Sequence, residues 1–138
     1  MADVFTKKKR SEVMSLIKSK NSKAELLVFK YLNQRGVYYQ KHYRRATGTP
    51  DIALPRKKRA VFIDGDFWHG RRLDDWIMKN GKDNYWAQKI IANIERDQRN
   101  RSDLISSGWQ VLTVWESDIN RKRTQALELA KISDFLIA

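Results

Sequence analysis

The sequence predicts an α/β fold in which a central mixed β-sheet is flanked by helices. Three observations carry this prediction. Two β-prone runs are joined by a short basic connection, a long helical pattern follows them, and another β-prone run comes after that helix. A short connection favours an antiparallel hairpin, whereas a crossover through a helix favours a parallel neighbour. We therefore expect both kinds of pairing in one sheet.

The helices are predicted from apolar periodicity and from capping signals. The sequence SKAE at residues 22–25 matches a capping box, whose first and fourth residues satisfy backbone N–H groups at a helix start. Gly36 is expected to end that helix, and Ser107 with Gly108 to end the long one. The expected helices cover residues 8–19, 22–36, 84–106 and 124–135.

The strands are predicted from runs of β-branched and aromatic residues. The most β-like run is WQVLTVW, and PRKKR forms the hairpin connection. Residues 65–82 are expected to be irregular. The expected strands cover residues 37–43, 51–54, 60–63 and 109–115.

The charge of the chain points to a polyanionic partner. Lysine and arginine number 28 against 16 acidic residues, so the 138 residues carry a formal net charge of +12. DNA or RNA would relieve the repulsion, because each neutralised phosphate also releases counterions. A membrane is a weaker candidate, because no apolar run approaches the roughly 20 residues that span a bilayer and the first residues lack the apolar core of a signal peptide. One domain over residues 1–138 fits this length.

The absence of cysteine narrows the chemistry. Disulfides, thiolate zinc sites and a cysteine nucleophile are excluded. We expect a cytoplasmic protein, associated with the nucleoid if its partner is DNA.

Two aspartates are candidates for a metal site. Asp51 lies at the start of one expected strand, and Asp64 ends the next. Pairing of these strands would bring the two carboxylates together, and such oxygen ligands suit Mg²⁺. A bound Mg²⁺ can lower the pKa of a water and neutralise charge on a phosphodiester. The alternative is that both are ordinary turn residues.

Glu25, His69 and Asp97 are further candidates, and each also has a structural explanation. Glu25 is the fourth residue of the capping box, which by itself accounts for it. His69 can exchange a proton near neutral pH, although a single loop histidine is often incidental. Asp97 lies on the broad apolar face of the long helix, so it needs a partner, either an arginine or a histidine that it orients. His42, in a basic and aromatic run, is given no role.

Aromatic residues beside basic ones are candidate DNA contacts. Phe67 and Trp68 are adjacent, so in an extended segment they would point in opposite directions and could hardly enter one core. Exposed aromatics of this kind stack on bases or wedge between them. The alternative is a small satellite core. Trp86, Lys89 and Asn93 would place an aromatic, a cation and an amide on one helix face.

These residues also carry a family resemblance: the chain resembles the very short patch repair (Vsr) DNA mismatch endonucleases. The matching segments occur in family order and cover nearly the whole chain. They are RSEVMSLIKSKNSKAE, GTPD, AVFIDGDFWHG, YWAQKIIANIERDQR and GWQVLTVWE. The resemblance implies a restriction-endonuclease-like fold and a monomeric enzyme that nicks double-stranded DNA and leaves a 5′-phosphate.

The resemblance also implies roles for the site residues. Asp51 and the backbone carbonyl of Ile63 would bind Mg²⁺, and Glu25 would hold metal-bound waters. His69 would act as general acid and base, and Asp97 would orient it.

The same resemblance implies which residues read the DNA. The three aromatic candidates match a wedge that enters from the major groove. Met14, on the basic helix over residues 8–19, matches an apolar residue that inserts from the minor groove. Lys89 and Asn93 match positions that contact the mispaired bases.

Two departures from the family matter. Many members hold a structural zinc, but its ligand positions carry other residue types here, so we predict no structural zinc. Those positions are Asp66, Arg71, Leu73 and Ser117. The loop must then be held in another way, for example by packing of Leu73, Trp76 and Ile77. Asp64, beside the metal-binding carbonyl position, is an additional candidate metal ligand or a strand cap.

Three functions are open at this stage. The first is Mg²⁺-dependent nicking at a T:G mismatch in DNA repair, with a repair-pathway protein as a further partner. The second is sequence-specific nicking of the homing or phage type. The third is a non-catalytic DNA-binding module, against which the complete set of Glu25, Asp51, His69 and Asp97 argues.

Overall fold

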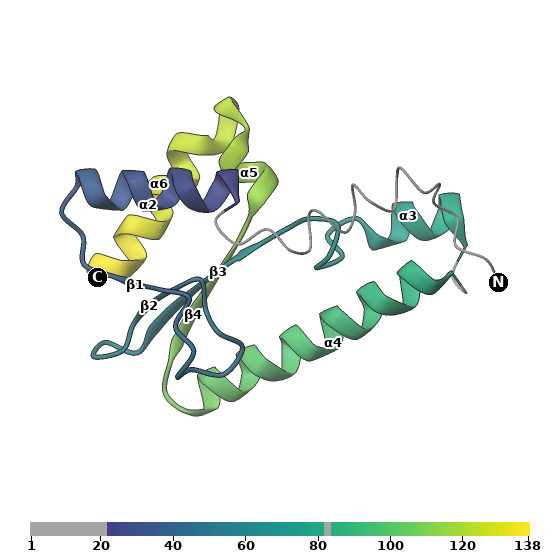
Figure 1. The fold of residues 1–138 in the computed structure, drawn as a ribbon, viewed down its shortest axis with the longest axis horizontal. Helices are drawn as coiled ribbons and strands as arrows, with labels where there is room; N and C mark the ends of the chain where they lie inside the picture. Colours follow the sequence, from purple (N-terminus) through teal and green to yellow (C-terminus); the bar gives the residue numbers. More distant parts are fainter. Residues whose placement is uncertain (1–21, 82–83) are drawn as a thin grey trace.

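The computed structural model describes residues 22–81 and 84–138 and confirms the predicted α/β class (Figure 1). The predicted basic helix over residues 8–19, with Met14, lies outside the described residues. In chain order the elements are α2 (Lys23–Gln34), β1 (Gln40–Lys41), β2 (Ile52–Leu54), β3 (Arg59–Asp64), α3 (Leu73–Asn80), α4 (Tyr85–Ser106), β4 (Gln110–Trp115), α5 (Glu116–Asn120) and α6 (Lys122–Ile137).

The four strands form one mixed sheet in the order β1-β2-β3-β4. β2 pairs antiparallel with both β1 and β3, and β3 pairs parallel with β4. The predicted hairpin and the predicted parallel crossover through α4 are both confirmed. Because β2 and β3 run in opposite directions, the start of β2 lies beside the end of β3, where Ile52 faces Val61.

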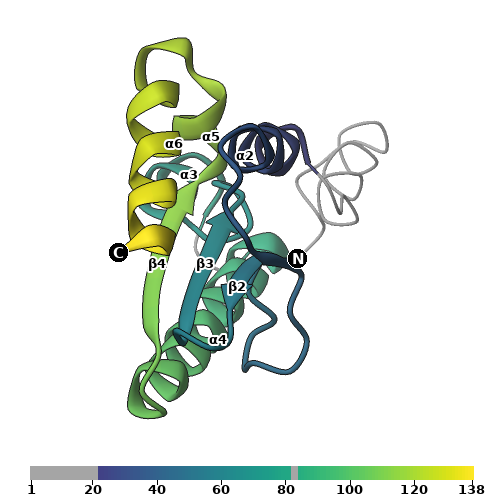
Figure 2. The same cartoon turned by 90° about the vertical axis from the view of Figure 1, so that its left-hand side faces the viewer.

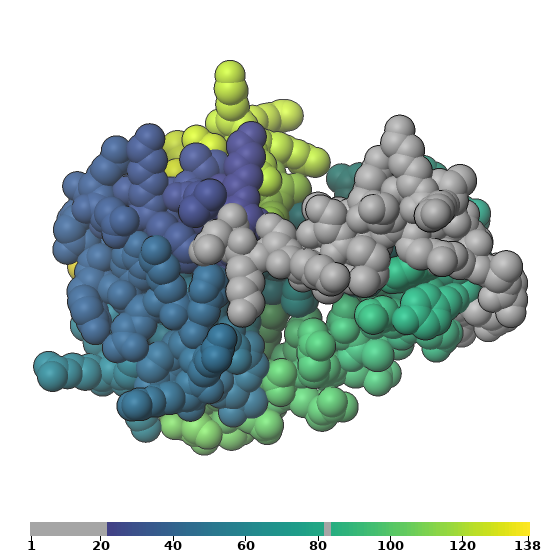
Figure 3. Space-filling model, viewed as in Figure 1, coloured from purple at the N-terminus to yellow at the C-terminus, as the bar shows by residue number. Residues whose placement is uncertain are grey.

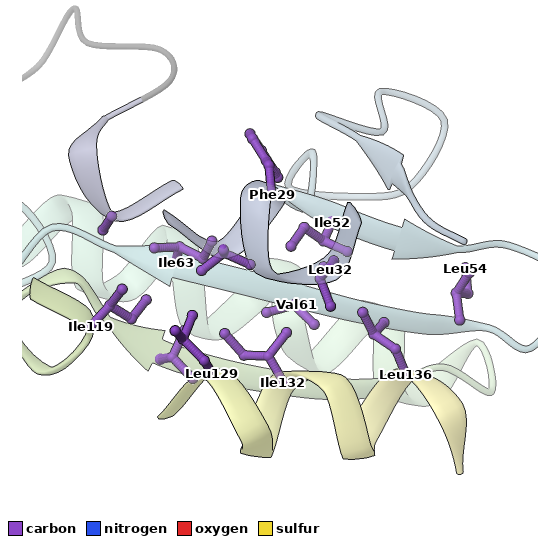
Figure 4. Close-up of a cluster of buried hydrophobic side chains, with 13 residues drawn as sticks. Phe29, Leu32, Ile52, Leu54, Val61, Ile63, Ile119, Leu129, Ile132 and Leu136 are labelled. Atoms are coloured by element: carbon purple, nitrogen blue, oxygen red, sulfur yellow. The ribbon is translucent and has the colours of Figure 1, made fainter. Parts of the chain in front are cut away.

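Helices cover both faces of the sheet (Figure 2). On one face, alternate β3 residues Val61 and Ile63 pack with α2, α5 and α6 in the larger core (Figure 4). On the other face, Ala60 and Phe62 pack against Leu104 of α4 in a smaller core. The alternation follows from the two-residue period of a strand, so β3 is the central layer to which both sets of helices are attached.

The caps of α2 are those that the sequence predicts. The backbone N–H of Glu25 donates to the Ser22 hydroxyl at 3.3 Å, and the Ser22 N–H donates to the Glu25 carboxylate at 3.1 Å. Gly36 follows the helix with a φ of +67°, a left-handed conformation that glycine adopts without steric cost. The capping box therefore places Glu25 on the first turn, with its side chain buried.

α4 is the longest helix, with 22 residues, and it extends away from the part of the molecule formed by α2 and the hairpin (Figures 1 and 3). Asn84 caps it by accepting a hydrogen bond from the backbone N–H of Trp86 at 2.8 Å. Its buried residues include Ile90 and Leu104, whereas much of its surface is polar. Among the described residues, no helix combines the length and apolar character needed to cross a membrane.

Two sequence predictions about elements are wrong, and one element was not predicted. The strand predicted over 37–43 is limited to Gln40–Lys41, because His42 has a φ of +45° and leaves the extended conformation. The region predicted to be irregular contains α3, whose eight residues are too few to show a clear helical period. α5 was not predicted, because it begins directly after β4 without a side-chain cap.

The larger core yields a stability prediction. Leu32 is fully buried under the sheet, whereas Leu26 on the same helix is 54% exposed. Leu32→Ala should lower the free energy of unfolding by about 2–5 kcal/mol, since a cavity is left behind. Leu26→Ala is the matched control and should cost less than about 0.5 kcal/mol. Urea denaturation of both variants measures the difference, and equal losses would contradict the described packing of α2.

Candidate active site

A cleft of about 530 Å³ opens where β2 begins and β3 ends. All four predicted catalytic residues line it, and they come from α2, the start of β2, the loop after β3, and α4. Other lining residues that the sequence singles out are Ile63, Asp64, Trp68, Lys89 and Asn93. The structure therefore brings together residues that are spread from position 25 to position 97 of the chain.

Asp51 lines the acidic part of this cleft between Glu25 and the end of β3. The backbone N–H of Ile63 donates to its Oδ2 at 2.7 Å, a contact set by the pairing of β2 with β3. Burial raises the pKa of Asp51 well above its ordinary value; the hydrogen bond from Ile63 opposes this, and the carboxyls of Glu25 and Asp64 add to the rise. The carboxylates predicted to converge do so, and their mutual repulsion favours binding of a proton or a cation.

Glu25 serves as a helix cap and also faces the cleft. Its Oε2 accepts the Ser22 N–H, while its Oε1 lies 3.2 Å from Nε2 of His42. The backbone N–H of His42 donates to the carbonyl of Asp51 at 2.9 Å, so His42 is tied to both acidic residues. The capping and cleft explanations of Glu25 are therefore compatible, and His42, to which the sequence assigned no role, is a neighbour of the site.

This donor set fits a divalent cation. Glu25, His42 and Asp51 each offer a ligand atom, and these atoms lie within 4.8 Å of one another. The carboxylates of buried Glu25 and partly buried Asp51 repel each other at this separation, and a cation between them would remove that cost. Oxygen ligands are those that Mg²⁺ prefers, and the adjacent Ile63 also lines the cleft.

His69 and Asp97 form a second, separate group among the residues that line the cleft. The Nδ1 atom of His69 is hydrogen-bonded to Oδ2 of Asp97. Burial alone would raise the pKa of Asp97, but the hydrogen bond from His69 and the charges of His69, Arg101 and Arg96 together lower it. A carboxylate bound to Nδ1 fixes the imidazole orientation, and Nε2 is then the nitrogen that can exchange a proton with a substrate.

Asp64 does not lie free in the cleft. Both of its carboxylate oxygens accept hydrogen bonds from the guanidinium of Arg101, each at 2.8 Å. Its Oδ1 also lies 3.7 Å from Nδ1 of His69. Asp64 is therefore a member of a buried ion pair as well as a neighbour of both halves of the site.

The aromatic candidates pack against one another. Trp68 and Trp86 are 9% and 3% exposed, and Phe67 and Trp76 pack against them. The expectation that Phe67 and Trp68 point apart is wrong: their rings lie 4.9 Å apart, because residues 66–70 form turns and not an extended strand. The satellite core that the sequence left as an alternative is thus present.

The positions that would hold zinc in the family form a polar network here. Asp66 accepts hydrogen bonds from the Ser117 hydroxyl at 2.6 Å and from the Ser117 N–H at 3.1 Å. Arg71 donates to the Ser117 hydroxyl at 3.1 Å and pairs with Asp118 at 3.0 Å. Leu73, the fourth position, begins α3. Together with the packing of Trp76, this network attaches the loop after β3 to the start of α5.

Glu116 also lines the cleft, although it was not predicted from the sequence. Burial raises its pKa; the Ser22 hydroxyl and His69 lower it, and the carboxylates of Glu25 and Asp66 add to the rise. The position of Glu116 in the sequence could have indicated its place in the cleft. Glu116 directly follows β4, which runs parallel to β3, so it lies at the same end of the sheet as Asp64.

The fold and the site together agree with one class of protein. Carboxylates gathered at the end of a hairpin within a mixed sheet, with a histidine–aspartate pair from the following loop and helix, fit the restriction-endonuclease-like nucleases that the family resemblance implies.

The comparisons identify the family within this class. The family model described as "DNA mismatch endonuclease Vsr" matches residues 2–75. The chain is 41% identical over 122 residues to "Type II nicking enzyme V.NmeAIP" of Neisseria meningitidis, which covers 88% of this chain and 87% of the relative. It is 39% identical to "Type II nicking enzyme V.HpaIIP" of Haemophilus parainfluenzae, covering 94% of each. It is 32% identical to "DNA mismatch endonuclease Vsr" of Escherichia coli K12, covering 84% and 74%.

The chain belongs to the Vsr family of endonucleases, as the resemblance indicated. It is therefore a nuclease, and the hypothesis of a non-catalytic DNA-binding module is set aside.

The raised pKa of Asp51 yields a prediction for the metal-free protein. A carboxyl whose pKa is higher in the folded state than in the unfolded state stabilises the fold only at low pH, and this contribution is lost as the pH rises through the folded-state pKa. In EDTA at neutral pH, Asp51→Asn should therefore melt higher than the wild type, by roughly 2–8 °C. The difference should shrink toward about pH 4.

Thermal melts across this pH range measure the effect. Asp103→Asn, at an exposed position of α4, is the control and should show no such pH-dependent gain. A lower melting temperature for Asp51→Asn at neutral pH would show that Asp51 is not held in a repulsive environment.

The polar network of the loop yields a second prediction. Asp66→Ala removes the acceptor of two Ser117 donors, so it should lower the free energy of unfolding by about 1–3 kcal/mol. Asp75→Ala, at an exposed position of α3, is the control. Urea denaturation measures the loss of stability in each variant. Repeating it on the wild type with EDTA tests whether a metal ion holds the loop, and we expect that the chelator does not reproduce the effect of Asp66→Ala. Similar losses of unfolding free energy in Asp66→Ala and Asp75→Ala would contradict the stabilising role given to the hydrogen bonds between Asp66 and Ser117.

Proposed function

We propose that the protein is a Mg²⁺-dependent endonuclease that nicks one strand of duplex DNA beside a T:G mismatch. The observation that carries this proposal is the cleft, which is lined both by the Glu25–Asp51 carboxylates and by the hydrogen-bonded His69–Asp97 pair. This is the arrangement that phosphodiester hydrolysis needs, because one side binds a cation and the other exchanges a proton. The relative from Escherichia coli that is named a mismatch endonuclease supports the substrate.

In this proposal the residues of the chain divide the work. Asp51 and the backbone carbonyl of Ile63 would hold Mg²⁺, which when bound would supply positive charge against the phosphate. Glu25 orients water at the same side. His69 takes a proton from the attacking water through Nε2, and Asp97 keeps the ring in place through Nδ1. As the water oxygen bonds to phosphorus, the bond from phosphorus to the 3′ oxygen would break. The leaving 3′ oxygen would take a proton from solvent, which gives a nick with a 5′-phosphate and a 3′-hydroxyl.

DNA contacts are proposed for α4 and for the loop after β3. Lys89 and Asn93 line the cleft one turn apart on α4, and Asn93 Nδ2 donates to the carbonyl of Trp68 at 3.1 Å. These residues would contact the mispaired bases. The aromatic cluster that contains Phe67, Trp68 and Trp86 would supply the wedge after it opens toward DNA. Met14 and the basic segment over residues 8–19 would contact the duplex from the other groove.

A second candidate function is nicking in another sequence context. Relatives of higher identity are named type II nicking enzymes, and their names do not mention a mismatch. This alternative keeps the same four catalytic residues and changes only how the target is read.

The setting of the reaction is proposed as well. All four catalytic residues come from one chain, so a monomer suffices. We propose that it acts on nucleoid DNA in the cytoplasm, with a repair-pathway protein as a further partner.

The proposal is tested with end-labelled duplexes that are fully matched or carry one T:G pair. In Mg²⁺ the wild type should nick beside the mismatch, whereas equal cutting of matched DNA would favour the second function. His69→Ala should slow nicking by roughly 10²–10⁴-fold, as expected for loss of a general base. Asp51→Ala should abolish it while leaving most DNA binding, which depends mainly on phosphate contacts.

The control is Lys131→Ala on the distant helix α6, which should nick at the wild-type rate. Full activity in Asp51→Ala would refute the assigned metal site.

A further inference from the structure

A buried ion pair joins α4 to the end of the central strand, and both of its residues line the cleft. Asp64 ends β3 and is 3% exposed. Arg101 reaches it from α4, one turn after Asp97, and its two terminal nitrogens each donate to a different Asp64 oxygen at 2.8 Å. Such bidentate pairing fixes both groups in one plane and is stronger than a single neutral hydrogen bond.

Two further contacts hold the Arg101 guanidinium in position. Its Nη1 donates to the hydroxyl of Thr113 on β4 at 3.2 Å, and its central carbon lies 4.2 Å from the centre of the Phe62 ring on β3. Arg101 thus crosses the neighbouring strands β3 and β4. Hydrogen bonds and ring stacking restrict this long side chain, so its positive charge is held at one place, beside Asp64.

That place lies beside the proton-exchanging half of the site. Asp64, His69 and Asp97 each offer a potential ligand atom, and these atoms lie within 4.8 Å of one another. Two carboxylates and an imidazole form a donor set that binds divalent transition metals. A cation there would compete with the hydrogen bond between Nδ1 of His69 and Asp97, which holds the imidazole in the orientation that the proposed reaction requires. Arg101 already supplies the positive charge and engages both Asp64 oxygens.

We propose that Arg101 is a positioning residue for nicking: by holding Asp64 it keeps metal ions away from His69 and leaves Asp97 as the carboxylate that orients the imidazole. This inference rests on the proposed nuclease function, because it assigns the metal to the Glu25–Asp51 side of the cleft. It accounts for why the buried carboxylate of Asp64 is tolerated so close to His69: the guanidinium of Arg101, held in place on α4, neutralises it.

The first test counts bound Mn²⁺ by electron paramagnetic resonance and does not depend on cleavage. Asp51→Ala removes the proposed main site. Adding Arg101→Met to that variant should create a new Mn²⁺ site, and adding Asp64→Asn as well should remove it. If Asp51→Ala/Arg101→Met binds no more Mn²⁺ than Asp51→Ala alone, the proposal is overturned, whether or not the wild type nicks DNA.

The second test separates positioning from folding. Arg101→Met should lower kcat for nicking by roughly 10–100-fold, the usual effect of losing a residue that supports a metal or catalytic group, while KM for DNA changes little. The double variant Asp64→Asn/Arg101→Met should recover most of the lost kcat, because no unpaired carboxylate remains. Arg101→Lys should retain more activity than Arg101→Met.

Controls and folding checks complete this test. Arg99→Met removes an exposed arginine from the same helix and should leave kcat unchanged. Circular dichroism establishes that each variant is folded; if Arg101→Met is not, the folded double variant decides the question. A double variant that is folded yet no more active than Arg101→Met, or as inactive as His69→Ala, would overturn the proposal. A wild type that does not nick at all would instead refute the proposed function, and the Mn²⁺ count would still decide whether Arg101 excludes metal.

Discussion

The antiparallel pairing of β2 with β3 is the constraint on which the rest of the site depends. It brings Asp51, just before β2, to the end of β3, where the N–H of Ile63 donates to its carboxylate. The parallel pairing of β3 with β4 then adds Glu116 at the same end. A shift of one residue in this register would move every strand side chain to the opposite face. The two apolar cores on the faces of β3 therefore also hold the acidic cleft in register.

Charge organises the molecule at two scales. The chain as a whole carries an excess of twelve positive charges, which attracts the phosphates of DNA. Its cleft concentrates acidic groups, and burial makes their repulsion costly. The protein compensates them locally, with the Ser22 cap on Glu25, the Arg101 guanidinium on Asp64 and the His69 imidazole on Asp97. Asp51 accepts a hydrogen bond from a backbone N–H, but its other charged neighbours are carboxylates. A bound cation would therefore stabilise the charged form of Asp51 more than that of the other acidic groups.

The loop after β3 shows how a family scaffold can be kept by other means. Gly70 approaches α4 so closely that a side chain there would collide with Ile94, and its φ of +71° also favours glycine. The hydrogen bonds of Asp66 and Ser117 fasten the same loop to α5. His69 is therefore held from both sides, which is what a general base requires if its geometry is to be reproducible.

The amino-acid sequence alone determined the α/β class, the hairpin, the capping box around Glu25 and the choice of four candidate catalytic residues that prove to line one cleft. These depend on local periodicity, on caps and on a motif in family order. Only the tertiary structure decided that His42 meets Glu25 across 17 residues and that Arg101 meets Asp64 across 37. It also decided that Glu116 joins the cleft and that the aromatic residues pack together. Such contacts depend on strand register and on the direction in which a turn points its side chains, and neither is encoded in the spacing of residues along the chain.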